Sequence, residues 1–198
     1  METGGEVATR LVGVGSPHGD DRVGWAVASR FAVLRYSRVE AVTIASPIGL
    51  LDLLGEVRDR SRAECGKGPS GGNVRGETYC GETVRGGNAC GAADRLIVCD
   101  AFAGEGPVGR LQRWDWPDSA IECVRSSGTH DVSLATALEL AGNLGLLPAS
   151  VVVWGIDVGP SPRLDPCGSA VGESSLPVAL ESAVGRLVWR LLQEVDGA

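Results

Sequence analysis

Several features that would assign a chain to a special class are missing from this sequence. None of the six cysteines forms a C-x-x-C pair, and no apolar run approaches the length of a membrane span. The first ten residues include Glu2 and Glu6 and no apolar stretch, so we expect no secretory signal there. We therefore expect reduced thiols, no membrane contact and a cytoplasmic location.

An excess of positive charge is also missing. The chain has 18 Lys and Arg against 25 Asp and Glu, which gives a net charge of −7. Nucleic acids and anionic membranes bind clustered Lys and Arg, so neither is an expected partner. With 198 residues and 43% hydrophobic content, the sequence is typical of one globular domain that covers 1–198. A monomer is the expected state.

The sequence does contain a regular alternation of apolar runs and helical stripes. Continuous apolar runs predict buried strands at 10–15, 39–44, 96–100 and 151–156, with a further strand at 109–114. Helical spacing of apolar residues predicts helices at 21–34, after Pro47, at 131–143 and at 176–195. This order predicts an α/β fold of three α/β/α layers around a mostly parallel, twisted sheet.

One long segment breaks the alternation. Residues 61–93 hold nine glycines, few large apolar residues and scattered charges. Such a composition buries too little surface to offset the entropy of ordering, which favours a flexible surface insertion. Its cysteines match no usual zinc spacing, so free thiols are the preferred interpretation.

Polar side chains that follow the predicted strands are the first candidates for a functional site. Ligands of open α/β sheets bind beyond the carboxyl ends of the strands. Asp20 and Asp21 follow the first strand, Asp100 ends the third, and His130 precedes a helix. Two carboxylates and an imidazole suit a divalent cation that keeps open coordination positions.

Each of these residues also has a purely structural interpretation. Asp100 can cap a helix or hold a loop, and His130 can be a surface or capping residue. The repulsion between Asp20 and Asp21 can be compensated by a cation, or by the dipole of the following helix. His18 is either a neighbour of the site or an exposed residue. Spacing alone leaves these alternatives open.

Two other classes of protein are disfavoured. The first loop reads G-x-G-S-P-H-G-D-D rather than G-x-G-x-x-G, with two acids where a pyrophosphate needs positive potential. A nucleotide-binding protein is therefore the weakest hypothesis. The sequence has no G-x-S-x-G elbow, and Ser126 and Ser127 have no triad acid beside them in the sequence.

Four motifs in order resemble the hydrogenase maturation endopeptidases. Residues 11–24 resemble the family signature G-x-G-N-x-x-x-x-D-[DE]-x-x-G, and 96–101 resemble its I-x-x-D-A motif. Residues 127–130 resemble its S-x-H segment, and 153–156 its V-x-G-I strand. The resemblance covers nearly the whole chain outside the insertion.

The resemblance implies an endopeptidase that removes a C-terminal extension from a nickel-loaded [NiFe] hydrogenase large-subunit precursor. In that family the second acid of the D-[DE] pair, the aspartate of D-A and the histidine bind nickel. Carried over, the catalytic and nickel-binding residues are Asp21, Asp100 and His130, and the nickel is supplied in the precursor. Asp20 would then either support the metal ligands without binding the ion itself, or act as a general base.

The sequence also departs from the family pattern. Ser16 replaces the usual asparagine, and the loop to Asp20 is one residue shorter. Residues 44–49 lack the acid that the family carries in a stretch linked to substrate choice. These departures keep a second hypothesis open: a non-catalytic module that checks metal occupancy or acts as an assembly chaperone.

Overall fold

The computed structural model describes residues 9–16, 19–65, 93–121, 125–126, 132–160 and 176–197. Its strands are β1 (Thr9–Val14), β2 (Val39–Ile44), β3 (Arg95–Ala103), β4 (Leu111–Asp115), β5 (Arg125–Ser126) and β6 (Ser150–Asp157). Its helices are α1 (Val23–Val33), α2 (Gly49–Cys65), α3 (Leu134–Asn143) and α4 (Val178–Asp196), with 3₁₀ turns η1 (Gly19–Arg22) and η2 (Ser119–Ile121). None of these helices is long and apolar enough to cross a membrane.

The strands form one mostly parallel sheet in the order β2-β1-β3-β6-β4. The first four are parallel neighbours, whereas β4 is antiparallel to β6, and β5 pairs with β3 off this path. All six residues of β1 are buried, as are seven of the nine in β3 and seven of the eight in β6. Continuous burial is expected for parallel strands that are covered on both faces, so the apolar runs in the sequence have their physical reason here.

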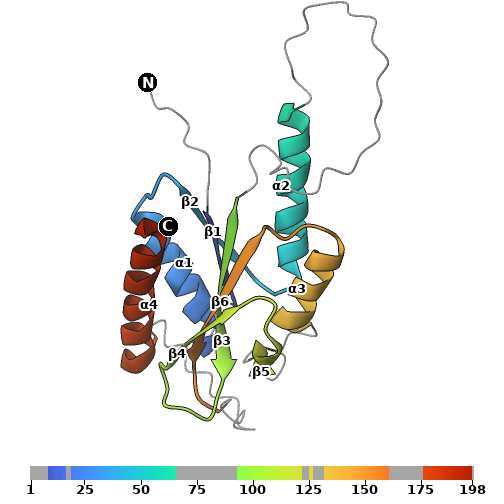
Figure 1. The fold of residues 1–198 in the computed structure, drawn as a ribbon. Helices are drawn as coiled ribbons and strands as arrows, with labels where there is room; N and C mark the ends of the chain where they lie inside the picture. Colours follow the sequence, from blue (N-terminus) through green and yellow to red (C-terminus); the bar gives the residue numbers. More distant parts are fainter. Residues whose placement is uncertain are drawn as a thin grey trace, which may run out of the picture.

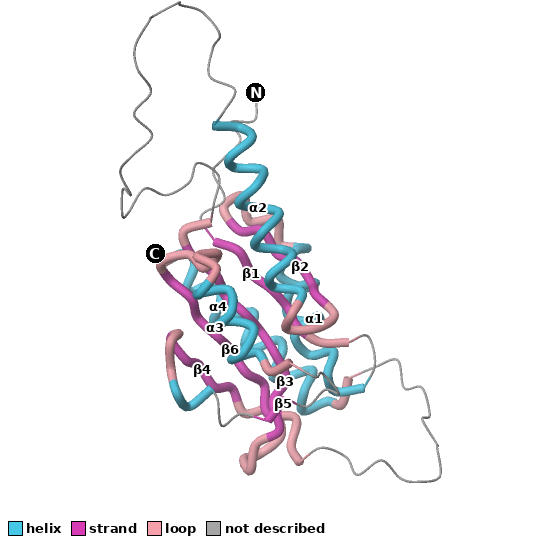
Figure 2. The backbone as a smooth tube through the Cα atoms, turned by 90° about the vertical axis from the view of Figure 1, so that its right-hand side faces the viewer, coloured by secondary structure: helices cyan, strands magenta, loops and turns pink. Residues whose placement is uncertain are grey.

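Helices cover both faces of the sheet (Figure 1). On one face, Leu11, Ile97 and Val152 pack in a core with apolar residues of α1 and α4. On the other face, the alternate strand residues pack with apolar residues of α2 and α3. Figure 2 shows the molecule turned by 90°, so that α2 and α3 overlie the strands of the sheet. The predicted three-layer α/β/α fold is confirmed.

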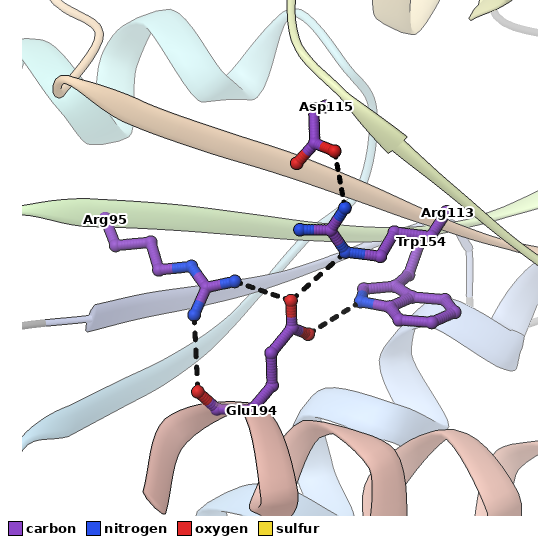
Figure 3. Close-up of polar contacts among 5 residues, drawn as sticks. All are labelled: Arg95, Arg113, Asp115, Trp154 and Glu194. Atoms are coloured by element: carbon purple, nitrogen blue, oxygen red, sulfur yellow. Dashed lines mark hydrogen bonds and ion pairs between the residues drawn. The ribbon is translucent and has the colours of Figure 1, made fainter. Parts of the chain in front are cut away.

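A network of charged groups joins α4 to the sheet (Figure 3). Oε1 of Glu194 accepts hydrogen bonds from Arg95 Nη2 at 2.6 Å and from Arg113 Nε at 3.1 Å. Its Oε2 accepts a hydrogen bond from Trp154 Nε1 at 3.1 Å. Arg113 also pairs with Asp115. One glutamate therefore fastens the helix to β3, β6 and the edge strand β4.

The chain reverses its direction of winding at β1. It passes through α1 to reach β2 on one side, and then through α2, over the opposite face, to reach β3 on the other side. The loops at the carboxyl ends of β1 and β3 therefore lead to opposite faces of the sheet. Such a topological switch point is where ligands bind in open α/β sheets.

Some local expectations need correction. The first helix, predicted at 21–34, ends at Val33, and Leu34 after it is 45% exposed. Residues 125–126, where no strand was predicted, form the short strand β5. The helix α2 continues to Cys65, so the first residues of the predicted insertion 61–93 are helical. Residues 66–92 lie outside the described ranges, and the rest of that prediction stays untested.

Candidate active site

Asp100 is the most unusual of the predicted site residues. It lies in β3, is 8% exposed, and its Oδ1 accepts a hydrogen bond from the Ala101 N–H at 2.8 Å. Burial raises the pKa of Asp100 to about 7; the hydrogen bond from Ala101 opposes this, and the negative charge of Asp21 adds to it. The carboxyl group therefore exchanges its proton near neutral pH, which is unusual for an aspartate.

Asp21 approaches Asp100 because glycines allow a tight turn after β1. Gly15 has a positive φ of 144°, and a Cβ at this position would collide with the backbone carbonyl oxygen of Asp21. A Cβ on Gly24 would lie 2.5 Å from the carbonyl oxygen of Cys99, the residue before Asp100. These close approaches hold η1 and the start of α1 against β1 and β3. Two acids far apart in the sequence thus interact across the switch point.

The third predicted ligand cannot be placed in the same way. His130 and His18 lie outside the described residues, whereas Asp20 lies beside Asp21 in η1. Among the residues that the structure describes, no group of three His, Cys, Asp or Glu side chains is arranged to hold a metal ion. The assignment of Asp21, Asp100 and His130 as catalytic nickel ligands therefore stays a prediction.

The chemistry of the pair nevertheless fits a cation. Asp100 is buried, and Asp21 adds negative charge beside it. Ionising both carboxylates is unfavourable unless a positive charge compensates them. A divalent ion that accepts oxygen and nitrogen ligands would supply that charge.

A small cavity of about 30 Å³ adjoins Asp100 on the α2/α3 face. Its walls include Phe102, Trp114, Ile121 and Gly155. A Cβ on Gly155 would lie 2.6 Å from the Phe102 ring and 2.8 Å from Trp114, so only glycine admits both rings. These aromatic walls explain the desolvation of Asp100. The cavity has room for one water molecule, and Trp114 Nε1 is buried with no hydrogen-bond partner in the part of the chain that the structure describes.

A larger cavity lies at the opposite end of the strands. It measures about 260 Å³ and is lined by Arg10, Arg58 and Arg95, among others. Arg10 is paired with Glu40, Arg95 with Glu194, and Arg58 donates to the Leu144 carbonyl oxygen. Because these guanidinium groups already have partners, size alone does not make this cavity the better candidate.

Sequence analysis missed a second buried carboxylate at the same end of the sheet. Asp157 closes β6, is fully buried, and accepts hydrogen bonds at Oδ1 from the N–H groups of Gly104 (3.1 Å) and Gly159 (2.9 Å). The strand predicted at 151–156 ended one residue before Asp157. The available signal was the same as for Asp100: a carboxylate that ends a buried strand.

The cysteine described beside the site is not a nucleophile. Cys99 is a free, fully buried thiol. Burial raises its pKa far above the ordinary value, and the charges of Asp100 and Glu194 add to this effect. The thiol stays protonated at neutral pH, so Cys99 is a core residue.

Together these features define a doubly wound α/β protein with two interacting aspartates at its switch point. Neither a protein-family model nor a curated protein matches the chain, but solved structures do. One is hydrogenase 2 maturation peptidase from Thaumarchaeota archaeon SCGC_AB-539-E09, with a TM-score of 0.51 at 20% identity, covering 94% of this chain and 97% of that one.

Two further structures give the same result. The hydrogenase maturating endopeptidase HybD from E. coli has a TM-score of 0.56 at 14% identity, covering 96% of this chain and 92% of that one. The [NiFe] hydrogenase maturation protease HycI from Thermococcus kodakarensis KOD1 has a TM-score of 0.54 at 15% identity, covering 98% and 95%. The chain therefore has the fold of the hydrogenase maturation endopeptidases, as the sequence resemblance implied.

Proposed function

We propose that this protein is an endopeptidase that removes a C-terminal extension from a nickel-loaded [NiFe] hydrogenase large-subunit precursor. The shared fold supports the class of activity. The observation that carries the proposal is the interaction of Asp21 with Asp100 at the switch point, because it joins two of the three residues that the motifs select. We further propose that the enzyme acts as a cytoplasmic monomer.

The nickel belongs to the precursor and arrives with it. Asp21, Asp100 and His130 would hold the ion, which can polarise the scissile carbonyl or lower the pKa of a water molecule. Ser126, the last described residue before His130, pairs with Phe102, two residues beyond Asp100. Four residues of extended chain reach at most about 14 Å, so the chain length is compatible with His130 joining the aspartates.

The protein's own groups contribute proton transfer and exclusion of water. Before the ion arrives, Asp100 can hold a proton near neutral pH because its pKa is about 7, and it would release that proton on binding the ion. The aromatic walls of the adjoining cavity exclude bulk water from its carboxyl group. Asp20, beside Asp21 in η1, is a candidate base.

The decisive experiment is a cleavage assay. The nickel-loaded precursor is incubated with the wild-type protein and with Asp21→Asn, Asp100→Asn and His130→Ala variants, and the products are weighed by mass spectrometry. We expect cleavage by the wild type and a loss of at least about a hundredfold in each variant. Asp59→Asn, which neutralises an exposed residue of α2, is the matched control and should cleave normally. Normal processing by the three site variants would refute the assignment.

The same assay tests the second candidate function. Residues 44–49 carry no acid at the turn from β2 into α2, where the related family carries one. A protein with an altered recognition turn can bind the precursor without cutting it. Stable binding of the nickel-loaded precursor with no change in its mass would favour a checkpoint or assembly chaperone.

A further inference from the structure

The edge strand brings one basic residue to the acidic end of the sheet. Asp21, Asp100 and Asp157 all lie at the carboxyl ends of parallel strands. Because β4 is antiparallel to β6, its beginning lies at this same end, and Arg110 immediately precedes it. The Asp157 N–H donates to the Arg110 carbonyl oxygen at 2.9 Å, which fixes the backbone there.

The guanidinium group of Arg110 is held in place from three sides. Its Nε lies 3.4 Å from Asp157 Oδ2, a buried oxygen that has no hydrogen-bond partner among the described residues. Its Cζ lies 5.8 Å from the centroid of the Phe102 ring. A Cβ on Gly106 would lie 2.7 Å from Arg110 Nε, so a larger residue would displace the group. Such support reduces the entropy that Arg110 loses on binding a ligand.

The outer half of this guanidinium group is available for a ligand. The Arg110 side chain is 45% exposed, and the contacts recorded for it among the described residues are those to Asp157 and Phe102. By contrast, Arg95 and Arg113 each pair with Glu194. Two parallel N–H groups on one planar fork match the two oxygens of a carboxylate.

A short extended peptide can reach from Asp100 to the region of Arg110. In the register of β3 and β6, Asp100 is opposite Gly155, and Phe102 is opposite Asp157. From the usual strand spacing and rise, the Cα atoms of Asp100 and Asp157 are roughly 8 Å apart. An extended peptide covers about 3.3 Å per residue, so it spans this separation in two to three residues.

We propose that Arg110 is a specificity-determining residue that binds a carboxylate of the peptide substrate, about two to four residues from the bond that is cut. This inference rests on the proposed endopeptidase function. The carboxylate is either an acidic side chain near the cleavage site or the terminal α-carboxylate of the extension. Asp157 orients Arg110 and does not itself touch the substrate.

The test compares Arg110→Gln and Arg110→Lys with Arg190→Gln. Arg190 is a matched control because its Cζ also lies 5.8 Å from an aromatic centroid, that of Trp154, but on the α4 face. We expect Arg110→Gln to raise KM for the nickel-loaded precursor about tenfold with kcat within about twofold, as loss of one charge-assisted contact would. Arg110→Lys should recover part of the loss, and Arg190→Gln should behave as the wild type.

Precursor variants identify the source of the carboxylate. In one set each acidic side chain of the extension is changed to its amide, and in another the C-terminus is lengthened by two glycines. One of these precursor changes should raise KM about tenfold for the wild-type enzyme. The same change should not raise KM further for Arg110→Gln. An unchanged KM for Arg110→Gln would overturn the inference. So would an Arg110→Gln enzyme whose KM still rises about tenfold for the altered precursor, as it does for the wild type.

Binding measured by calorimetry separates this inference from the proposed function. If the wild type binds the precursor without cutting it, the endopeptidase proposal fails. A tenfold weaker binding by Arg110→Gln would then still support the carboxylate site. If cleavage proceeds and Arg110→Gln is indistinguishable from the wild type, the function stands and the inference fails. If the wild type neither binds nor cuts, both are wrong.

Discussion

The backbone carbonyl of Asp21 packs directly on Gly15, at the end of β1, where no side chain can be accommodated. This contact determines where the acidic turn η1 lies, and so how near Asp21 comes to Asp100. The position of a candidate catalytic acid therefore depends on a glycine that takes no part in the chemistry.

Replacing Gly15 should damage both stability and activity. In Gly15→Ala the new Cβ meets the Asp21 carbonyl, and the positive φ of 144° is strained for alanine. We expect a loss of roughly 2–4 kcal/mol in the free energy of unfolding, measured by urea denaturation. Gly55→Ala is the control: it lies within α2 with open space around it, so it should be neutral or slightly stabilising. Equal stabilities for the two variants would contradict this view of the turn.

The buried carboxyl of Asp100 should make stability depend on pH. Its pKa rises from 3.8 in the unfolded chain to about 7 in the folded protein. Between these values the folded state binds more protons than the unfolded state, so the contribution of Asp100 to stability is lost as pH rises from about 4 to about 7. In the metal-free protein, Asp100→Asn removes this dependence and should be more stable than the wild type at pH 8, by on the order of 2 kcal/mol.

The check is the difference in unfolding free energy between the wild type and Asp100→Asn, measured from pH 4.5 to pH 8.5. The difference should grow with pH and level off above about pH 8. A constant difference across this range would mean that the carboxyl group titrates normally.

The negative charge of Asp21 should contribute to this titration. Neutralising it in Asp21→Asn removes a like charge and lowers the pKa of Asp100, which stays above its ordinary value because burial is the larger cause. The pKa is measured from the pH dependence of the Asp100 carboxyl carbon in NMR spectra. Asp20→Asn is the control, since Asp20 is not among the causes of the shift. An equal effect of both substitutions would refute a specific interaction with Asp21.

The sequence was sufficient to predict the features that depend on local pattern. Apolar runs and helical stripes located the main strands and helices, because a doubly covered parallel sheet buries continuous segments. The same alternation placed Asp21 and Asp100 at one end of the sheet, because parallel strands end on the same side. Their electrostatic interaction follows from that topology.

Features that depend on long-range contacts could not be predicted from local patterns. The orientation of β4, and with it the position of Arg110, is determined by pairing with β6. The burial of Asp157 depends on the N–H groups of Gly104 and Gly159, which satisfy a carboxylate that would otherwise require solvent. The spacing of residues in the sequence carries neither kind of information.

The interactions of Glu194 should be a main source of stability for the edge strand. Glu194→Ala leaves the half-buried Arg95 guanidinium and the Trp154 indole N–H without their carboxylate acceptor. Removing the acceptor of a partly buried cation costs more than an exposed ion pair contributes, so we expect a loss of roughly 2–3 kcal/mol by urea denaturation. Glu194→Gln keeps an acceptor without the charge and should lose less. Glu139→Ala, at an exposed position of α3, should change stability by less than about 0.5 kcal/mol.

Because Arg113 of β4 also depends on Glu194, amide hydrogen exchange in Glu194→Ala should speed up more in β4 than in β1. An equal increase of the exchange rate in both strands would show that the Glu194 interactions do not hold the edge strand.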